Sequence, residues 1–271
     1  VAPPLAVKVS DDGARAFSYD EGRTAETRSA VHDMAASEFF ALCRDGRSAR
    51  RPYFVSPVSA LSGGDALLER FPEWRELKDP AAEAPAHLSV WIGGVGTQTQ
   101  AHYDNADNVF LQLAGRKRFM IWPPDAAPHL HTFPDAHCKA RKSQMEEPFD
   151  RLAAANAPER FPFSAALPPP RVVDLAPGDA LFVPAFTFHH VEVLGAAEGE
   201  EEEEEEENDD ARVSVSVNVF SQCAQSAAAA ALLQHSLLPQ PPRDAAQFED
   251  ALCAARRVLA HLAAHVALPP L

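Results

Sequence analysis

Cysteine is scarce in this sequence, and its four copies are widely spaced. Cys43, Cys138, Cys223 and Cys253 form no CxxC pair and no dense framework. Zinc fingers and disulfide scaffolds need clustered cysteines, so the sequence argues against both. We expect a reducing environment and therefore a cytoplasmic or nuclear protein.

Long apolar runs are also missing. No stretch approaches the roughly 18 apolar residues that span a bilayer, and no charged-then-apolar leader is present. The sequence therefore predicts a soluble protein that makes no use of a membrane. With 46% hydrophobic residues among 271, it can bury a sizeable core.

Basic residues are the minority class. Lysine and arginine number 24 against 39 acidic residues, for a net charge of −15. Eleven of the acids lie within residues 198–210, which hold no basic residue. Such a run repels itself and has little apolar surface to bury, so we expect a disordered, solvated insertion. The alternative is that it helps to select basic partners.

The periodicity of the chain changes along its length. Residues 5–10 predict a strand, 29–44 a helix capped by Ser29, and 63–72 a short helix. From about residue 88, short β-branched or aromatic segments alternate with glycine or proline turns and predict strands at 87–94, 108–115, 117–124, 171–175, 179–185, 189–194 and 212–220. Many short strands with few helices favour a β-sandwich or barrel.

Alanine-rich helices are expected after Phe220. In the second of them, residues 244–268, an apolar face recurs at steps of three or four and includes Phe248, Leu252, Leu259 and Leu262. Such a face fits either packing against the domain or a homodimer interface.

A candidate metal site begins with His102 and Asp104. Two residues apart on a strand, they would point to the same side and could share one ion. The pair His189–His190 is the best source of a third ligand, and two histidines with one carboxylate are the ligand set of non-haem ferrous oxygenases. Taken alone, an HxD pattern is more often two polar residues at a strand end.

Lys117 stands in an otherwise apolar row with Phe119 and Ile121. A buried ammonium needs an anion nearby, so an anionic ligand is expected if this row faces the core. The alternative is a cationic hairpin, "GRKR", in water. The strand at 212–220 alternates in the same way, with valines on one face and Ser214, Ser216, Asn218 and Phe220 on the other, which fits a cavity wall or a solvent face.

Four segments occur in an order that is typical of one known family. They are Thr99–Gln100–Ala101–His102–Tyr103–Asp104, "AGRKRFMIWPP", "PGDALFVPAFTFHH" and "VSVNVF". With them the chain resembles the JmjC (cupin-like) dioxygenases over about residues 53–220. It is most similar to the small hydroxylase branch that includes the asparaginyl hydroxylase of the hypoxia pathway and the wybutosine tRNA hydroxylase.

This resemblance implies a fold and a domain organisation. The fold is a mainly β double-stranded β-helix, or jelly roll. We expect a single domain over residues 1–271: an N-terminal strand and helix in 1–52, the jelly-roll core with its acidic insertion in 53–222, and C-terminal helices in 223–271.

The resemblance also implies cofactors, Fe(II), 2-oxoglutarate and O2, and the residues that bind them. His102, Asp104 and His189 would bind iron, with His189 preferred to His190 because it is the fifth residue after Pro184. Lys117 and Thr99 would hold the distal carboxylate of 2-oxoglutarate. The remaining cosubstrate pocket would comprise Asn108, Asn218, Phe110, Phe220 and Tyr53, with Trp91 as an alternative wall.

The sequence departs from the asparaginyl hydroxylase at the expected substrate-binding residues. Arg141 matches an arginine near substrate, but Lys142 replaces the glutamine that holds the target amide. Four functions follow: a protein side-chain hydroxylase, which we favour; an RNA hydroxylase, suggested by Lys139, Arg141 and Lys142; a histone lysine demethylase; and a non-redox cupin-like metal-binding protein.

Overall fold

The computed structural model describes residues 4–10, 16–17, 29–45, 48, 50–70, 72–77, 87–133, 141–145, 161, 163–195 and 212–223. These residues form a mainly β jelly roll. The acidic run at 198–210, the predicted C-terminal helices after Cys223, Cys138, Lys139 and Cys253 lie outside the described residues. The expectations for them, including the homodimer interface, stay predictions.

The described strands are β1 Leu5–Ser10, β2 Ala16–Phe17, β3 Ser29–Met34, β4 Arg51–Pro57, β5 His87–Gly94, β6 Gln98–His102, β7 Asp107–Ala114, β8 Arg116–Trp122, β9 Arg171–Leu175, β10 Ala180–Val183, β11 Phe188–Leu194 and β12 Val213–Ser221. The helices are α1 Ala36–Arg44 and α2 Gly64–Arg70, with the 3-10 turns η1 Val58–Ala60, η2 Pro72–Leu77, η3 Pro124–Ala126 and η4 Ser164–Ala166. In this part of the chain, no helix is both long and apolar enough to cross a membrane.

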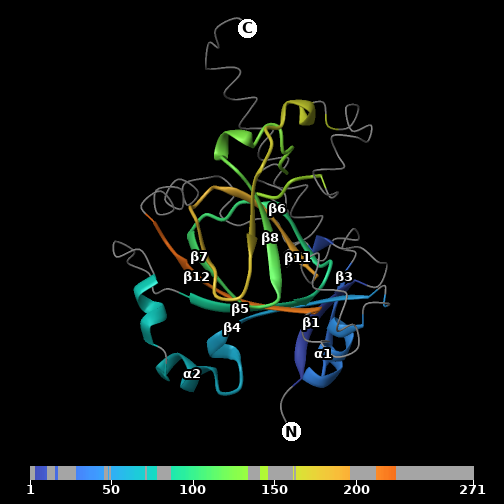
Figure 1. Ribbon diagram of the computed structural model, residues 1–271, viewed down its shortest axis with the longest axis vertical. Helices are drawn as coiled ribbons and strands as arrows, with labels where there is room; N and C mark the ends of the chain where they lie inside the picture. Colours follow the sequence, from blue (N-terminus) through green and yellow to red (C-terminus); the bar gives the residue numbers. More distant parts are fainter. Residues whose placement is uncertain are drawn as a thin grey trace, which may run out of the picture.

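Two sheets face each other. One has seven strands in the order β10-β7-β12-β5-β4-β1-β3, and the other has five in the order β2-β6-β11-β8-β9 (Figure 1). Between them lies a hydrophobic cluster of Phe110 from β7 with Phe119 from β8 and Leu175 from β9. The inner faces of both sheets therefore form one interior, in which side chains from opposite sheets meet.

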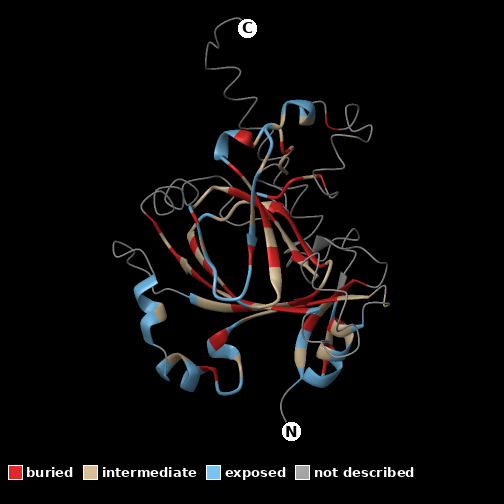
Figure 2. Ribbon diagram, viewed as in Figure 1, coloured by how far each residue is buried: buried red, intermediate tan, exposed pale blue. Residues whose placement is uncertain are grey.

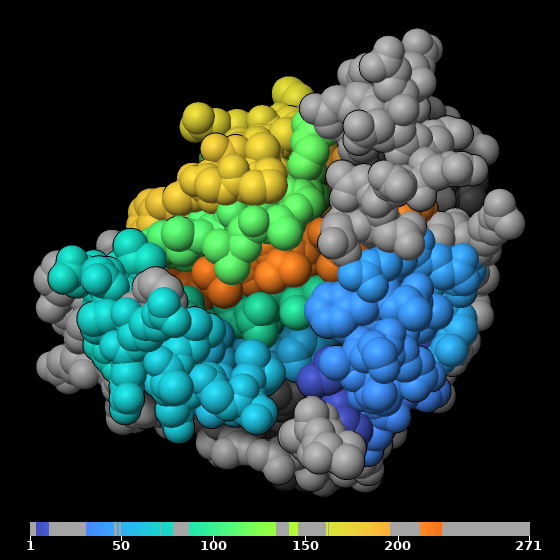
Figure 3. Space-filling model, turned by 60° about the horizontal axis from the view of Figure 1, so that its bottom comes forward, coloured from blue at the N-terminus to red at the C-terminus, as the bar shows by residue number. Residues whose placement is uncertain are grey.

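The helices cover the outer face of the seven-stranded sheet. Phe39 and Cys43 of α1 and Val58 of η1 pack on Phe54 of β4 and Val90 of β5. Figure 2 shows that α2 stays mostly exposed. Seen from this side, β12 and β5 reach the surface between the cyan segment that includes α2 and the blue segment that includes α1 (Figure 3). The helices hold the large sheet from outside and leave its inner face free for a site.

The strands predicted from residue 87 onward are confirmed within a few residues at their ends, and glycine and proline explain two of the turns between them. Gly115 adopts φ 64° in the turn between β7 and β8, where an added Cβ would lie 2.5 Å from the carbonyl oxygen of Val213. Only glycine fits there, because the backbone conformation is left-handed and the space is occupied. β10 ends at Val183, directly before Pro184, as expected for a residue that cannot donate to a ladder.

The helix predicted over residues 29–44 is wrong in its first half. Residues Ser29–Met34 form β3, which pairs antiparallel with the whole of β1, and the helix begins only at Ala36. Ser29 therefore caps nothing. Val31 is 63% exposed on this edge strand. Pairing with β1 has overridden a helical spacing of apolar residues, which is a weak signal over so few positions.

Candidate active site

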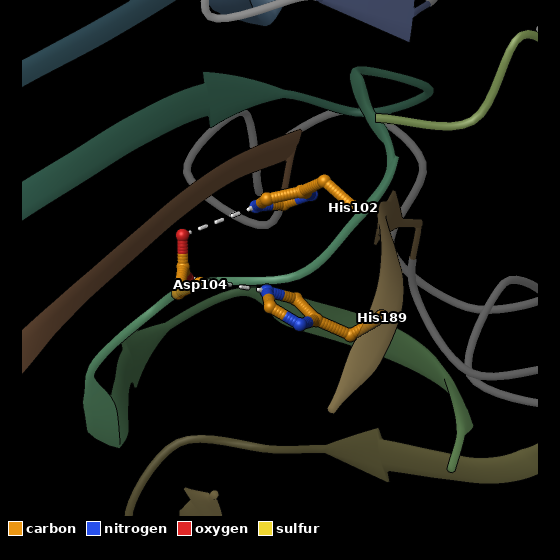
Figure 4. Close-up of side chains that lie close together, drawn as sticks. All are labelled: His102, Asp104 and His189. Atoms are coloured by element: carbon orange, nitrogen blue, oxygen red, sulfur yellow. Dashed lines mark ion pairs between the residues drawn. The ribbon is translucent and has the colours of Figure 1, made fainter. Parts of the chain in front are cut away.

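Three side chains from two neighbouring strands and a loop meet at one end of the barrel. His102 is the last residue of β6, Asp104 lies in the loop that follows, and His189 is near the start of β11. Their candidate ligand atoms all lie within 4.8 Å of one another. Nε2 of His102 is 3.9 Å from Asp104 Oδ1, and Nε2 of His189 is 3.7 Å from Asp104 Oδ2 (Figure 4).

A bulge in β6 aims His102 at this point. His102 pairs with His189 and Thr99 pairs with Val191, so three steps along β6 match two steps along β11. The extra residue lets both Thr99 and His102 face the interior, although strict alternation would put them on opposite sides. Asp104 lies in the loop after β6 and not on the strand. The prediction that alternation along a strand brings Asp104 to the same side as His102 was therefore wrong.

The loop that carries Asp104 is tied to the segment before His189. The backbone N–H of Phe186 donates to the carbonyl oxygen of Asp104 at 2.7 Å. The N–H of Ala185 donates to Oδ1 of Asp107 at 2.8 Å. These bonds hold the carboxylate in place relative to β11 even though the two segments are far apart in sequence.

Each histidine is held in the tautomer that leaves Nε2 free to bind a metal. Nδ1 of His102 lies 2.8 Å from the carbonyl oxygen of Gln100, and Nδ1 of His189 lies 3.0 Å from that of Thr187. A carbonyl only accepts, so each Nδ1 donates and the lone pair of a neutral ring sits on Nε2. Burial, together with the neighbouring His189, lowers the pKa of His102 to about 3, which keeps this ring neutral.

These donors fit a divalent transition metal. Bonds to nitrogen and oxygen ligands are about 2.0–2.2 Å, so two ligands of one ion can lie up to about 4.2 Å apart, and both measured separations from Asp104 are shorter. Two imidazoles and one carboxylate leave coordination positions open. Asp104 remains 24% exposed while His189 is 4% exposed, so the cluster is open toward solvent on the carboxylate side.

His190 points away from this cluster. Of the two adjacent histidines, the structure places His189 beside His102 and Asp104, and His190 is buried on the opposite face of β11. The preference for His189 over His190 therefore agrees with the geometry.

Lys117 is buried in the barrel interior. Its side chain is 1% exposed, its Nζ donates to Ser216 Oγ at 2.7 Å, and the ammonium lies 5.0 Å from the centre of the Phe110 ring. Burial lowers its pKa to about 7. This excludes the alternative of a fully solvated "GRKR" hairpin, although Arg118 of the same strand does pair with Asp174 at the surface.

An aromatic path joins Lys117 to the histidine cluster. Phe110, which lies beside the ammonium, packs edge-on against Phe119 with ring centres 4.9 Å apart. Phe119 in turn stacks on His189 at 6.3 Å. Lys117, these two rings and the candidate metal ligands therefore lie together in one part of the barrel interior, which we call the chamber.

Polar side chains complete the chamber. Trp91 Nε1 donates to Asn218 Oδ1 at 2.7 Å, and Asn218 Nδ2 donates to Asn108 Oδ1 at 3.1 Å. The hydroxyls of Tyr53 and Thr99 lie 3.3 Å apart. Phe220 is only partly buried, in register with Asn108 at the end of β12. The polar face predicted for residues 214–220 thus faces the interior rather than solvent.

Arg141 and Lys142 lie beside the end of β6 that carries His102. Lys142 forms an isolated β-bridge with His102, and the N–H of Tyr103 donates to the carbonyl oxygen of Arg141. Lys142 is 8% exposed, and its charge is close enough to contribute to lowering the pKa of His102. Arg141 is exposed in a left-handed conformation with φ 72°, and its Nη1 donates to Asn105 Oδ1.

Sequence reasoning missed three residues of the chamber. Ser216 is the hydrogen-bond partner of Lys117, Phe119 stacks on His189, and Gln112 donates to Ser214 Oγ at 2.9 Å. Alternation could have found them, since Gln112 shares a face with Asn108 and Phe110, and Ser216 shares one with Asn218. Alternation does not show which residue of a strand face contacts Lys117, because that depends on how strands that are distant in sequence pair.

The profile of the family described as "Cupin-like domain" matches residues 2–223. HSPB1-associated protein 1 from Rattus norvegicus is 34% identical over 109 residues, which cover 39% of this chain and 21% of that protein. Lysine-specific demethylase JMJ31 from Arabidopsis thaliana is 26% identical over 111 residues, covering 41% of this chain and 19% of the relative.

A third relative is named for work on RNA. The tRNA wybutosine-synthesizing protein 4 from Gibberella zeae is 34% identical over 88 residues, covering 32% of this chain and 7% of that protein. The chain thus spans about a fifth or less of the length of these three curated relatives.

Proposed function

Because the chain belongs to the cupin-like (JmjC-type) domain family, we propose that it is an Fe(II)- and 2-oxoglutarate-dependent dioxygenase that hydroxylates a protein side chain. One observation carries the proposal. Two imidazoles and a carboxylate converge at one end of the chamber, and the buried amine of Lys117 lies within the same chamber. A metal and a small dicarboxylate together would satisfy both features.

Each residue has a defined role in this proposal. His102, Asp104 and His189 hold Fe(II) through Nε2 and carboxylate oxygens. Lys117 pairs with the distal carboxylate of 2-oxoglutarate, assisted by Ser216, whose hydroxyl already accepts from Nζ. Thr99, Tyr53, Asn108 and Asn218 hold polar parts of the cosubstrate, and Phe110 and Phe220 form apolar walls.

When bound, iron would supply the coupling of 2-oxoglutarate decarboxylation to the transfer of one oxygen atom onto a substrate C–H bond. The protein would orient the reactants and exclude water. The backbone acceptors of Gln100 and Thr187 keep both rings in the ligand tautomer. The stacked Phe119 fixes the plane of His189 and shields it from water.

A protein substrate is favoured over RNA by charge. The net charge of −15, eleven units of which lie in residues 198–210, opposes binding of a phosphate backbone, which depends on clustered cations. RNA is the second candidate because Arg141 and Lys142 are two adjacent basic residues beside His102. Binding that weakens steeply with added salt would support RNA, and salt-insensitive binding would support a protein.

Turnover of 2-oxoglutarate to succinate tests the proposed activity. The full chain is incubated with Fe(II), ascorbate and pools of peptides or tRNA, with mass spectrometry for a gain of roughly 16 Da, one oxygen atom. His102→Ala and Asp104→Ala should each abolish succinate formation, while His129→Ala, at a histidine outside the cluster, should keep it. Activity retained in both ligand variants would contradict the metal assignment. No turnover in any pool would favour a non-redox cupin-like protein.

A further inference from the structure

A second cavity lies at the other end of the barrel from the metal ligands. It has a volume of about 250 Å³ and is walled by the end of α1, the start of β4, the turn between β5 and β6, and the end of β11. β11 connects the two sites: His189 lies near its first residue and Leu194, which lines the cavity, is its last. Five residues of extended chain separate them, or roughly 17 Å.

Arginine dominates the charge of this cavity. Arg50, Arg51 and Arg212 line it, against the two carboxylates of Asp45 and Glu192. Glu192 Oε1 accepts from Gln98 Nε2 at 3.1 Å. The lining therefore presents a net positive charge to whatever enters it.

Arg51 has a side-chain N–H group available for a hydrogen-bond acceptor. Its Nη1 donates to the carbonyl oxygens of Ser48 and Arg50, but its Nε is buried and has no hydrogen-bond partner among the described residues. Gly96, at φ 80°, lies opposite this nitrogen. A Cβ added to Gly96 would still be 3.9 Å from Arg51 Nε. A buried donor left unpaired is unfavourable, and an oxyanion matches the fork formed by Nε and a terminal nitrogen of arginine.

We propose that this cavity, the arginine pocket, binds the phosphate group of a small metabolite. Its volume lies below the roughly 300–1,000 Å³ of pockets that hold drug-sized ligands, so the occupant is compact. A tetrahedral phosphate offers oxygens in several directions and can meet Arg51 inside and Arg212 at the exposed rim together. Asp45 and Glu192 limit the negative charge that the pocket accepts, which disfavours a nucleic-acid strand.

The chain itself contains a competing source of anions. Gly195 and Arg212 both line the pocket, and the segment between them in sequence carries the eleven acidic residues of 198–210. Tethering at both ends gives those carboxylates a high effective concentration near the arginines. The experiment must therefore separate a free phosphate from the chain's own glutamates. It must also separate this pocket from Lys117, the other buried cation.

Thermal unfolding of the full chain in inorganic phosphate tests the proposal. Sodium phosphate replaces sodium chloride at constant ionic strength and pH, and the melting temperature is followed as phosphate rises. We expect a saturable increase. Arg51→Gln and Arg212→Gln should each raise the phosphate concentration at half-saturation by about tenfold or more, as loss of a charge-assisted bond predicts. Arg75→Gln, an arginine stacked on Trp74 outside the pocket, and Lys117→Met should leave it unchanged.

Each outcome decides the proposal. A saturable increase that both pocket variants weaken supports it, and Arg212→Gln keeps the test valid if Arg51→Gln fails to fold, because Arg212 is exposed. An increase that neither pocket variant changes means an adventitious ion only and overturns it. So does a response that appears only after residues 200–207 are replaced by glutamine, since the occupant would then be the chain's own carboxylates. A complete lack of saturable stabilisation overturns it as well.

Discussion

Lys117 shows how one residue can define a ligand. Its ammonium has a hydroxyl and an aromatic ring as described contacts, and burial lowers its pKa to about 7. Burying an ammonium in this way opposes folding, whereas pairing it with a carboxylate inside the barrel reverses that cost. Lys117 thus lowers the free energy of unfolding of the ligand-free protein and raises its affinity for 2-oxoglutarate in the proposed complex.

Replacing Lys117 with methionine should therefore act in opposite directions on stability and on binding. We expect the melting temperature of the ligand-free protein to stay equal or rise, because a buried charge is removed. We expect 2-oxoglutarate to bind roughly 100-fold more weakly, as loss of a buried ion pair of about 3 kcal/mol implies. Both are measured by thermal unfolding with and without 2-oxoglutarate, with Arg116→Met of the same strand as control. Unchanged binding would remove Lys117 from the cosubstrate site.

The same lysine predicts how binding depends on pH. The pKa of Lys117 in the ligand-free protein is lowered to about 7 from an ordinary value of 10.5, so above pH 7 most of the protein must take up a proton before it can pair with a carboxylate. With metal held saturating, the dissociation constant of 2-oxoglutarate should rise by about tenfold per pH unit above 7. Calorimetry between neutral and alkaline pH measures this, and the slope should vanish in Lys117→Met. A flat profile in the parent protein contradicts the assignment.

That lysine also bears on folding stability, with the sign set by the lowered pKa. The unfolded chain binds the proton of Lys117 more tightly than the folded chain does, so the ligand-free protein loses stability as pH falls from about 10.5 toward 7. Below pH 7 both states are protonated and this contribution becomes constant.

At the scale of elements, turns decide how the strands meet. β7 and β8 are joined at Gly115, which has φ 64° and approaches the backbone of Val213 closely. Gly178, before β10, has φ 96° but open space around it. Both glycines have a positive φ, but only Gly115 has neighbouring atoms where a Cβ would be. The two positions therefore form a matched pair.

Alanine at these two glycines should therefore destabilise the fold to different extents. Gly178→Ala should lower the free energy of unfolding by about 1–2 kcal/mol, the cost of a left-handed non-glycine residue. Gly115→Ala should cost about 2–4 kcal/mol, because a Cβ there also collides with the Val213 carbonyl. Urea unfolding of both variants measures the difference, and equal losses would show that the contact with β12 relaxes freely.

Elements also show why part of the site could be predicted from the sequence and part could not. The sequence shows residue types and the order of motifs directly, and these were enough to select His102, Asp104 and His189 as candidate ligands. The bulge that turns His102 inward depends on pairing between β6 and β11, and the contact of Lys117 with Ser216 joins β8 to β12 across the barrel. The strand β3 was mistaken for helix because its partner β1 lies about 20 residues away. Register between distant segments is absent from local periodicity.

At the scale of the whole molecule, the proposed metal would connect parts that the chain leaves far apart. Its ligands come from the end of β6, the following loop and the start of β11. The loop is already bonded to Phe186, so a bound ion would hold the open end of the barrel together. A ligand that binds only the folded state raises its stability by about 2.7 kcal/mol at 100 times its dissociation constant.

Metal binding should therefore be visible in unfolding without any turnover. With Mn(II) in place of oxidisable Fe(II), the melting temperature should rise by about 5–10 °C, since each kcal/mol is worth about 2–4 °C in a chain of this size. Chelation with EDTA should reverse the rise. Asp104→Ala and His189→Ala should abolish it, because each removes a ligand from the cluster, while Asp125→Ala, an exposed carboxylate in η3, should preserve it. A rise that survives both ligand variants would place the bound ion elsewhere in the protein.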